Sequence, residues 1–115
     1  MTQFKTRFDL PPLVERAVQR LIRAFRPERI VLFGSYAKNR VRQDSDVDLL
    51  VIANLRGDSF SHQRRARQLA SDCFPRVDIV LAAPEDIAGA PTAKSLFLHS
   101  ILGTGITIYH RNDSG

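Results

Sequence analysis

The sequence predicts an α/β fold of the α+β type, in which helices pack on a small mixed β-sheet. Four short apolar runs rich in β-branched residues have the length of strands, and segments with helical periodicity or helix caps alternate with them. The predicted order is α, β, β, α, β, α, β, and this alternation is typical of helices that cover a sheet. The length of 115 residues fits one domain, with an arm at 1–10 and a tail at 111–115.

The first helix is expected to begin near Asp9, which can accept a capping hydrogen bond, and to end before Pro27. Two prolines after Asp9 are tolerated in a first turn, and apolar residues recur at helical spacing with arginines between them. Two apolar segments, 29–33 and 47–52, then predict buried strands.

A second helix is expected over 60–74, where Pro75 would break it, and its inward residues are predicted to be Ala66, Leu69, Ala70 and Cys73. The apolar segment 77–81 predicts a third buried strand, and 84–86 a short helical turn. A helix over 92–102, with Thr92 as its cap and Gly103 as its stop, precedes a last strand at 106–109.

The chain is basic, with 17 Lys and Arg against 12 Asp and Glu and a net charge of +5. Such a charge favours a polyanionic ligand such as a nucleotide or RNA, or an acidic partner, about as strongly as it favours plain basic helix surfaces. His62, Arg64, Arg65 and Arg67 form a basic patch on one predicted helix, which we interpret as a solvated face before an RNA or partner surface. A hydrophobic content of 43% excludes a disordered chain.

A single cysteine, Cys73, excludes an internal disulfide framework and a cysteine-rich zinc site. Its apolar position predicts a buried, inert thiol, as is usual in a reducing cytoplasm. No apolar stretch approaches the roughly 20 residues of a membrane span, and the first residues lack the apolar core of a signal peptide. We therefore expect a cytoplasmic protein without a membrane partner.

The first chemical signal is the glycine–serine pair that follows the first strand. Gly34 allows close approach of the backbone to a ligand, and a turn into a short helix would aim backbone N–H groups at a phosphate. Ser35 adds a hydroxyl donor. By itself this pair is a weak signal, because Ser35 could simply cap a helix after a tight turn.

The second signal is a set of three aspartates. Asp46 and Asp48 are two residues apart at the mouth of a strand, so both project from one face, and Asp78 interrupts the next apolar strand. Like charges about 4 Å apart repel by about 4 kcal/mol at an effective dielectric of 20, so such a set favours a bound cation. Oxygen ligands select Mg²⁺ or Mn²⁺. The alternative is that Asp78 pairs with an arginine, either Arg76 or Arg29.

Two segments in the first half of the chain carry a family resemblance. GSYA at 34–37 and SDVDL at 45–49 resemble the signature of the polymerase-β-type nucleotidyltransferase superfamily, and more narrowly of the minimal nucleotidyltransferase (MNT) family. VDIV at 77–80 is similar to the segment with the third carboxylate, and GITIY at 105–109 is similar to the family's closing strand. The resemblance covers roughly Arg29 to Tyr109 and implies the polymerase-β-type fold.

The resemblance also implies an activity, the transfer of AMP from ATP, or of another nucleotide from its NTP, to an acceptor with release of pyrophosphate. Gly34 and Ser35 would hold the triphosphate, and Asp46 and Asp48 would bind two Mg²⁺ ions, with Mn²⁺ as an alternative. Asp78 would bind the catalytic metal and help to activate the acceptor oxygen.

The loop between the two motifs adds a candidate ligand and a departure from the family pattern. Arg42 is expected to neutralise triphosphate charge, against the alternative of a solvated basic loop. Asn39 replaces the family glycine, and Gln43 replaces a frequent proline. Because asparagine tolerates a left-handed backbone, the departure puts the efficiency of the site in question before its existence.

Many MNT proteins act beside a helical HEPN partner as the antitoxin of a toxin–antitoxin pair and adenylylate a tyrosine of that partner. Larger relatives carry a second domain that binds the acceptor, so we expect a partner chain or a second copy to complete the cleft here. Two alternatives stay open: transfer to RNA or to a small hydroxylated molecule such as an antibiotic, and a non-catalytic antitoxin that acts by contact.

Overall fold

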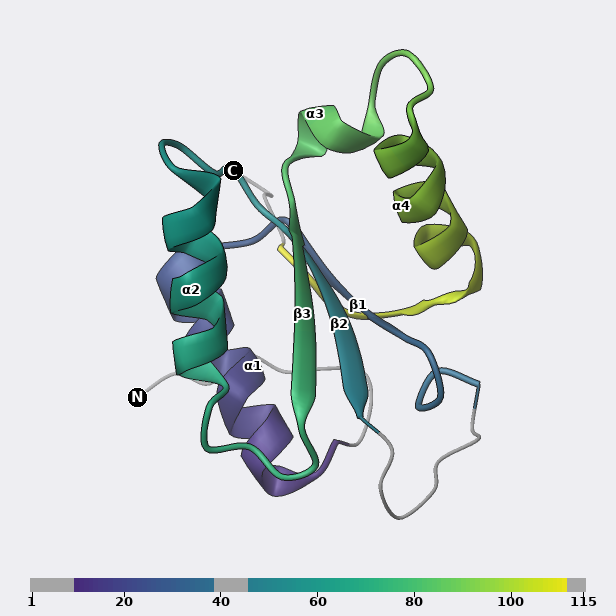
Figure 1. Ribbon diagram of the computed structural model, residues 1–115. Helices are drawn as coiled ribbons and strands as arrows, with labels where there is room; N and C mark the ends of the chain where they lie inside the picture. Colours follow the sequence, from purple (N-terminus) through teal and green to yellow (C-terminus); the bar gives the residue numbers. More distant parts are fainter. Residues whose placement is uncertain (1–9, 39–45, 112–115) are drawn as a thin grey trace.

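The computed structural model describes residues 10–38 and 46–111 and shows a four-stranded mixed sheet between two layers of helices (Figure 1). The strand order is β3-β2-β1-β4, in which β2 and β3 are parallel and the other pairs are antiparallel. The strands are β1 (Arg29–Phe33), β2 (Val47–Ile52), β3 (Val77–Ala82) and β4 (Ile106–His110). The helices are α1 (Pro12–Phe25), α2 (Ser59–Leu69), α3 (Pro84–Ile87) and α4 (Ala93–Thr104). The predicted fold class is confirmed.

The two faces of the sheet carry two separate hydrophobic clusters. α1 and α2 cover one face, where Val47, Leu49 and Val51 of β2 are fully buried. The intervening residues Leu50 and Ile52 point to the opposite face and pack with α4. Since β2 is buried on both sides, its sequence is an almost continuous apolar run in which Asp48 is the one interruption.

β3 is an edge strand, and this corrects the prediction of a third buried strand over 77–81. From Val77 to Leu81 its residues are only partly buried, and Ala82 alone is fully buried. Hydrophobic periodicity cannot distinguish an edge strand from a central strand, because an edge strand that packs on both faces is as apolar as a central one. The exposed edge leaves the acid in this strand within reach of solvent.

The second helix ends earlier than its sequence predicts. α2 stops at Leu69, and the chain continues in tight turns in which Ser71 and Cys73 donate backbone hydrogen bonds three residues back. Side chains terminate the helix. The hydroxyl of Ser71 donates to the carbonyl of Gln68. The two terminal guanidinium nitrogens of Arg20, on α1, donate to the two carboxylate oxygens of Asp72. Cys73 therefore lies in a turn and is only partly buried.

The ends of the chain also differ from expectation. Leu10, assigned to a terminal arm, packs against the cluster under α1, whereas Asp9, expected to cap α1, lies outside the described residues and α1 begins at Pro12. Arg111, assigned to the tail, donates hydrogen bonds to the carbonyls of Arg26 and Glu28 and extends the ordered chain beyond β4. Within the described ranges, no helix combines the length and apolarity needed to cross a membrane.

α4 ends at Thr104 with Gly105 as its cap, so Gly103, expected to stop the helix, is an ordinary helical residue. A Cβ on Gly105 would lie 2.5 Å from Cγ1 of Val31, 2.7 Å from the carbonyl oxygen of Ile101 and 2.9 Å from that of Leu32. A Cβ on Gly103 would meet nothing within 4 Å. Close packing, and not the helix stop alone, therefore requires a glycine at position 105.

Gly105→Ala is expected to destabilise the protein by about 1 to 3 kcal/mol, because backbone carbonyls cannot move away from the added methyl group. Gly103→Ala, two residues earlier and inside α4, is the matched control and is expected to be neutral or stabilising by up to about 1 kcal/mol. Urea denaturation followed by circular dichroism measures both. Equal effects of the two substitutions would contradict the packing explanation.

Candidate active site

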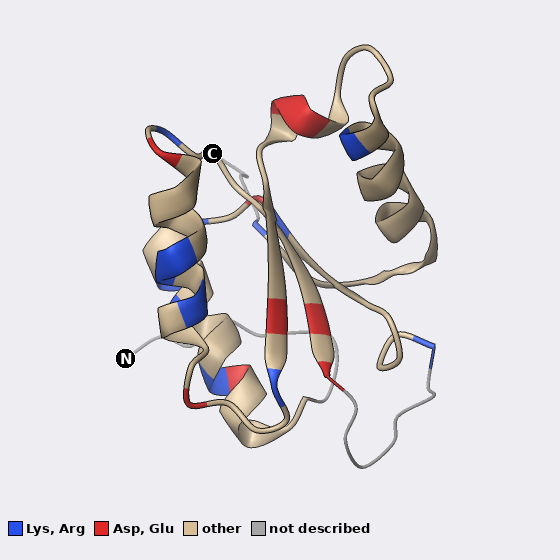
Figure 2. Cartoon of the chain, viewed as in Figure 1, with Lys and Arg blue, Asp and Glu red and all other residues tan. Residues whose placement is uncertain are grey.

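Two acidic side chains meet near the amino ends of β2 and β3, the parallel strand pair of the sheet. Asp48 of β2 is the register partner of Asp78 of β3. Register partners in neighbouring strands project from the same face, so the two carboxyl groups lie side by side. Figure 2 shows the acidic bands of β2 and β3 at matching heights. The acids share their face with Leu50, which packs against α4, but lie toward the amino ends of β2 and β3, away from that helix.

The charge of Asp48 is held in an unfavourable environment. Partial burial raises the pKa of its carboxyl above the ordinary value, and repulsion by Asp78 and by Asp46 raises the pKa further. Asp46 is exposed, immediately before β2. The three acids predicted from the sequence are therefore within electrostatic reach of one another, with Asp48 at the centre.

Gly34 lies against Asp48 at the end of β1. Antiparallel pairing places Phe33 opposite Asp48, so the next residue turns directly past the carboxylate. A Cβ on Gly34 would lie 2.2 Å from Oδ2 of Asp48, and the backbone of Gly34 has a positive φ of 74°. A side chain at this position would fill the space beside the carboxylate, so the structure requires glycine here for two reasons.

The residues after Gly34 form a turn. The N–H of Lys38 donates to the carbonyl of Gly34 at 3.2 Å, and Ser35 is exposed in between. The predicted short helix does not form within the described residues up to Lys38. Arg42 and Asn39 fall in 39–45, outside the described residues, so the expected role of Arg42 on the nucleotide stays a prediction.

Asp78 has an ion pair, as one of the alternatives from the sequence anticipated. Nε of Arg76 lies 3.4 Å from Oδ1 of Asp78, and both side chains are exposed, by 77% and 45%. Arg29, the other candidate, instead donates a hydrogen bond to Oγ1 of Thr107. An exposed pair of this kind contributes only about 0 to 1 kcal/mol, so it can exchange for a stronger ligand. The ion pair and a cation site are compatible uses of the same carboxylate.

The donor set fits a hard divalent cation in its chemistry, because the three acids offer carboxylate oxygens alone and their mutual repulsion is relieved by positive charge. Within the described residues, no three Asp, Glu, His or Cys side chains are already gathered as metal ligands. Asp48 and Asp78 are paired by the sheet, whereas Asp46 precedes the strand and would have to turn toward them.

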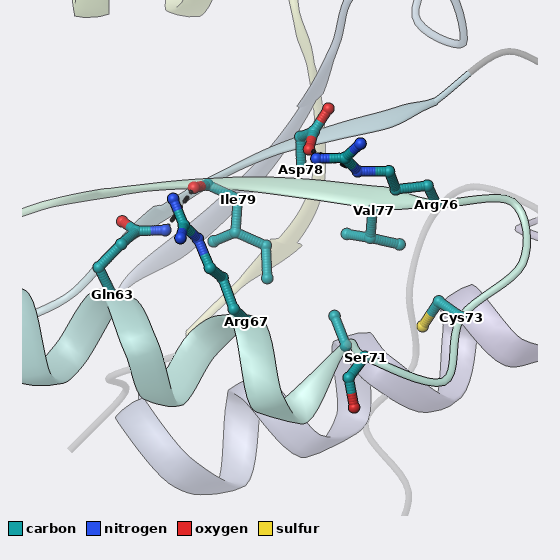
Figure 3. Close-up of a pocket in the computed structure, with 9 residues that line it drawn as sticks. Gln63, Arg67, Ser71, Cys73, Arg76, Val77, Asp78 and Ile79 are labelled. Atoms are coloured by element: carbon teal, nitrogen blue, oxygen red, sulfur yellow. Dashed lines mark hydrogen bonds and ion pairs between the residues drawn. The ribbon is translucent and has the colours of Figure 1, made fainter.

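A cavity that no sequence pattern indicates lies beside Asp78. A pocket of about 500 Å³ lies between α2 and β3, and two arginines, Arg67 of α2 and Arg76, line it together with Asp78 (Figure 3). Arg76 carried a detectable signal, since it is two residues before Asp78, and this spacing places two side chains on the same side of an extended chain. Arg67 joins the pocket only through the packing of α2, which no local pattern encodes.

The remaining candidates have structural partners. Burial raises the pKa of the Cys73 thiol, whose sulfur donates to the carbonyl of Leu13 at 3.4 Å, as suits an inert cysteine. On α2, the guanidinium of Arg64 stacks on Phe60 and that of Arg65 on Phe25. His62, in the same patch, contacts the carbonyl of Arg56.

Comparison with known proteins fits this geometry. The model of the family described as "Polymerase beta, Nucleotidyltransferase" matches residues 15–114. The chain belongs to this family. The expectation of a polymerase-β-type nucleotidyltransferase is thus confirmed, and the matched region includes the Gly34 turn and the three acids.

A solved structure with a similar fold is "Crystal structure of the toxin-antitoxin with AMP-PNP". It is 24% identical to this nucleotidyltransferase domain, with a TM-score of 0.57 over 84% of this chain and 73% of the other. At this identity the likeness supports the fold alone. No curated protein matches the chain.

Asp48→Asn is expected to raise the melting temperature of the metal-free domain by about 1 to 4 °C near neutral pH, because it removes a charge that the fold disfavours. The folded pKa of Asp48 is raised, so between the ordinary and the raised value the folded state binds more protons than the unfolded state. The wild-type protein therefore loses stability as pH rises through this window, and the variant loses less. Thermal unfolding of both proteins in EDTA across this pH range tests the prediction, and the same pH dependence in the variant as in the wild type would contradict it.

Gly34→Ala is expected to destabilise the domain by about 1 to 3 kcal/mol more than Gly57→Ala, because only Gly34 has a carboxylate where the methyl group would be. Gly57 has a similar φ of 86° with nothing near its Cβ position, so it reports the backbone effect of about 1 to 2 kcal/mol alone. Denaturant titrations of both variants give the difference. Equal losses would mean that the approach to Asp48 is not tight.

Proposed function

We propose that this domain transfers a nucleoside monophosphate, most simply AMP from ATP, to a hydroxyl group of a partner protein, with a tyrosine of a HEPN-type toxin as the acceptor and an antitoxin role for the chain. Membership of the nucleotidyltransferase family supports the class of reaction. One observation carries the assignment of the site: Asp48 and Asp78 lie in register on one face, and Gly34 lies against Asp48.

Each residue has a task in this reaction that follows from its position. The turn after β1 offers backbone N–H groups and the Ser35 hydroxyl to the triphosphate, and Gly34 keeps the approach to Asp48 open. Asp78, on the exposed edge strand, is placed to receive an acceptor hydroxyl and to take its proton. A bond then forms between the acceptor oxygen and the α-phosphorus, the bond to the β-phosphate bridge breaks, and pyrophosphate leaves.

Asp46, Asp48 and Asp78 would hold two Mg²⁺ ions. When bound, such ions neutralise the triphosphate and lower the energy of both the attacking and the leaving oxygen. The raised pKa of Asp48 and the oxygen-only donor set support this part of the proposal. Arg76 would exchange its weak pair with Asp78 when the cation binds.

A toxin partner and a nucleotide substrate have support from a structural neighbour. The similar solved structure is of a toxin–antitoxin with AMP-PNP, an ATP analogue, which makes a nucleotide and a toxin reasonable ligands to test here. The resemblance of the sequence to the MNT family also favours a toxin partner.

Incubation of the full chain with α-labelled ATP, Mg²⁺ and a candidate toxin is expected to label the toxin. Asp48→Ala and Asp78→Ala should each reduce the labelling by at least about a hundredfold, because each removes a metal ligand and a charge next to the reacting phosphate. Asp72→Asn is the matched control, since Asp72 is in an exposed ion pair with Arg20 away from this face.

Binding of the toxin by wild type and variants, measured in parallel, separates catalysis from contact. Tight binding without transfer under Mg²⁺ or Mn²⁺ would overturn the enzymatic proposal in favour of neutralisation by contact. Label that appears only on RNA or on a small molecule would overturn the choice of acceptor.

A further inference from the structure

The outer edge of β3 presents backbone groups that no strand pairs with among the described residues. Arg76 and Ala82 direct their carbonyls toward β2, where Val47 and Ala53, the residue after the strand, donate to them. Backbone direction alternates along a strand, so the intervening residues Val77, Ile79 and Leu81 direct theirs outward. The amide of Gln63 on α2 donates to the carbonyl of Ile79 at 3.0 Å, in the position that an N–H of an added strand would occupy.

A pocket of about 500 Å³ lies along the first half of this edge (Figure 3). Its lining is mixed: Val77, Ile79 and Ala70 contribute apolar surface, and polar and charged side chains contribute the larger share. Because β3 is the last strand of the sheet, the pocket reaches Asp78 even though this side chain projects from the opposite face of the sheet from Val77 and Ile79. A ligand in the pocket can therefore pass a side chain over the edge to Asp78.

The charge of the pocket is positive apart from Asp78. Arg67 reaches from α2 toward the edge strand, and Arg76 lies beside Asp78 (Figure 3). Arg67 is exposed and forms no ion pair with another described residue. A ligand that brings negative charge would satisfy both guanidinium groups and leave Asp78 to the reaction.

We propose that this pocket is the acceptor site, and that it takes an extended, acidic peptide segment whose hydroxyl residue reaches Asp78 while a neighbouring Asp or Glu binds Arg67. This proposal rests on the proposed function and names the class of acceptor. The acidic flank orients the segment, and the outward backbone groups of β3 hold it extended.

A peptide fits this edge better than RNA does. The edge offers N–H donors and C=O acceptors at the spacing of a β-strand, and a peptide backbone supplies both complements. A sugar-phosphate backbone has no N–H group to donate to the carbonyls, and the apolar contacts that Val77, Ile79 and Ala70 offer suit side chains better than phosphates. The two arginines alone would not favour an acidic peptide over RNA, because both ligands carry negative charge.

Fluorescence anisotropy with short fluorescein-labelled peptides tests the docking step without nucleotide. A tyrosine flanked by glutamates should bind the full wild-type chain more tightly than the same peptide with glutamines, and the preference should shrink as salt is added. Arg67→Ala should weaken the glutamate peptide about fivefold, as for the loss of one partly exposed ion pair, and leave the glutamine peptide unchanged. Arg64→Ala, on the same helix but outside the pocket, should change neither.

Equal binding of the two peptides, or equal effects of Arg67→Ala and Arg64→Ala, would overturn the acidic-segment proposal. So would an RNA oligonucleotide that displaces the glutamate peptide and accepts label in its place. The transfer arm uses the same peptides with α-labelled ATP and Mg²⁺, where Arg67→Ala should raise KM for the glutamate peptide with little change in kcat. If the peptide preference holds but no label is transferred, the docking surface stands and the transferase proposal fails.

Discussion

The parallel pairing of β2 with β3 is the constraint on which the candidate site depends. Its register joins Asp48 to Asp78 and joins the apolar residues on either side of them, Val47 to Val77 and Leu49 to Ile79. A slip of β3 by one residue would send Asp78 to the face covered by α1 and α2, away from Asp48, and would remove Val77 and Ile79 from that apolar face. The burial of Leu49 and Val51 therefore fixes the position of the carboxylates, and the core and the site share one determinant.

The residues of the candidate site also lower the stability of the folded domain. Two carboxyl groups side by side at the end of a buried strand oppose folding, as the raised pKa of Asp48 indicates. Gly34 adds a backbone conformation that other residues adopt with difficulty. Arg76 relieves part of the repulsion at Asp78, but its exposure limits what it contributes. Such local conflict is expected where a ligand, and not the chain itself, completes the interactions.

The sequence predicted most of the elements because each has a local cause. β1 and β2 follow from short apolar runs between breakers, and α4 from the cap at Thr92, whose side chain accepts a hydrogen bond from Ser95. The misses have causes that lie elsewhere in the chain. α2 ends early because Arg20 of α1 binds Asp72, and the edge position of β3 depends on strand order, which periodicity does not report. The i, i+2 spacing of Asp46 and Asp48 and the position of Asp78 inside an apolar strand pointed to these acids, whereas Arg67 enters the pocket only by tertiary packing.

The end of β1 is held between two glycines that differ in what could replace them during evolution. Gly105 meets backbone carbonyls, which every sequence of this fold retains, so no second substitution elsewhere makes room for a larger residue. Gly34 meets a side-chain oxygen, so a shorter residue at position 48 would remove the clash. A lineage that has abandoned the chemistry and lost Asp48 is thus released from one of the two constraints on Gly34, the positive φ being the other, whereas the constraint on Gly105 stays. In related chains, the paired loss of these two residues would mark descendants that retain the architecture without the reaction.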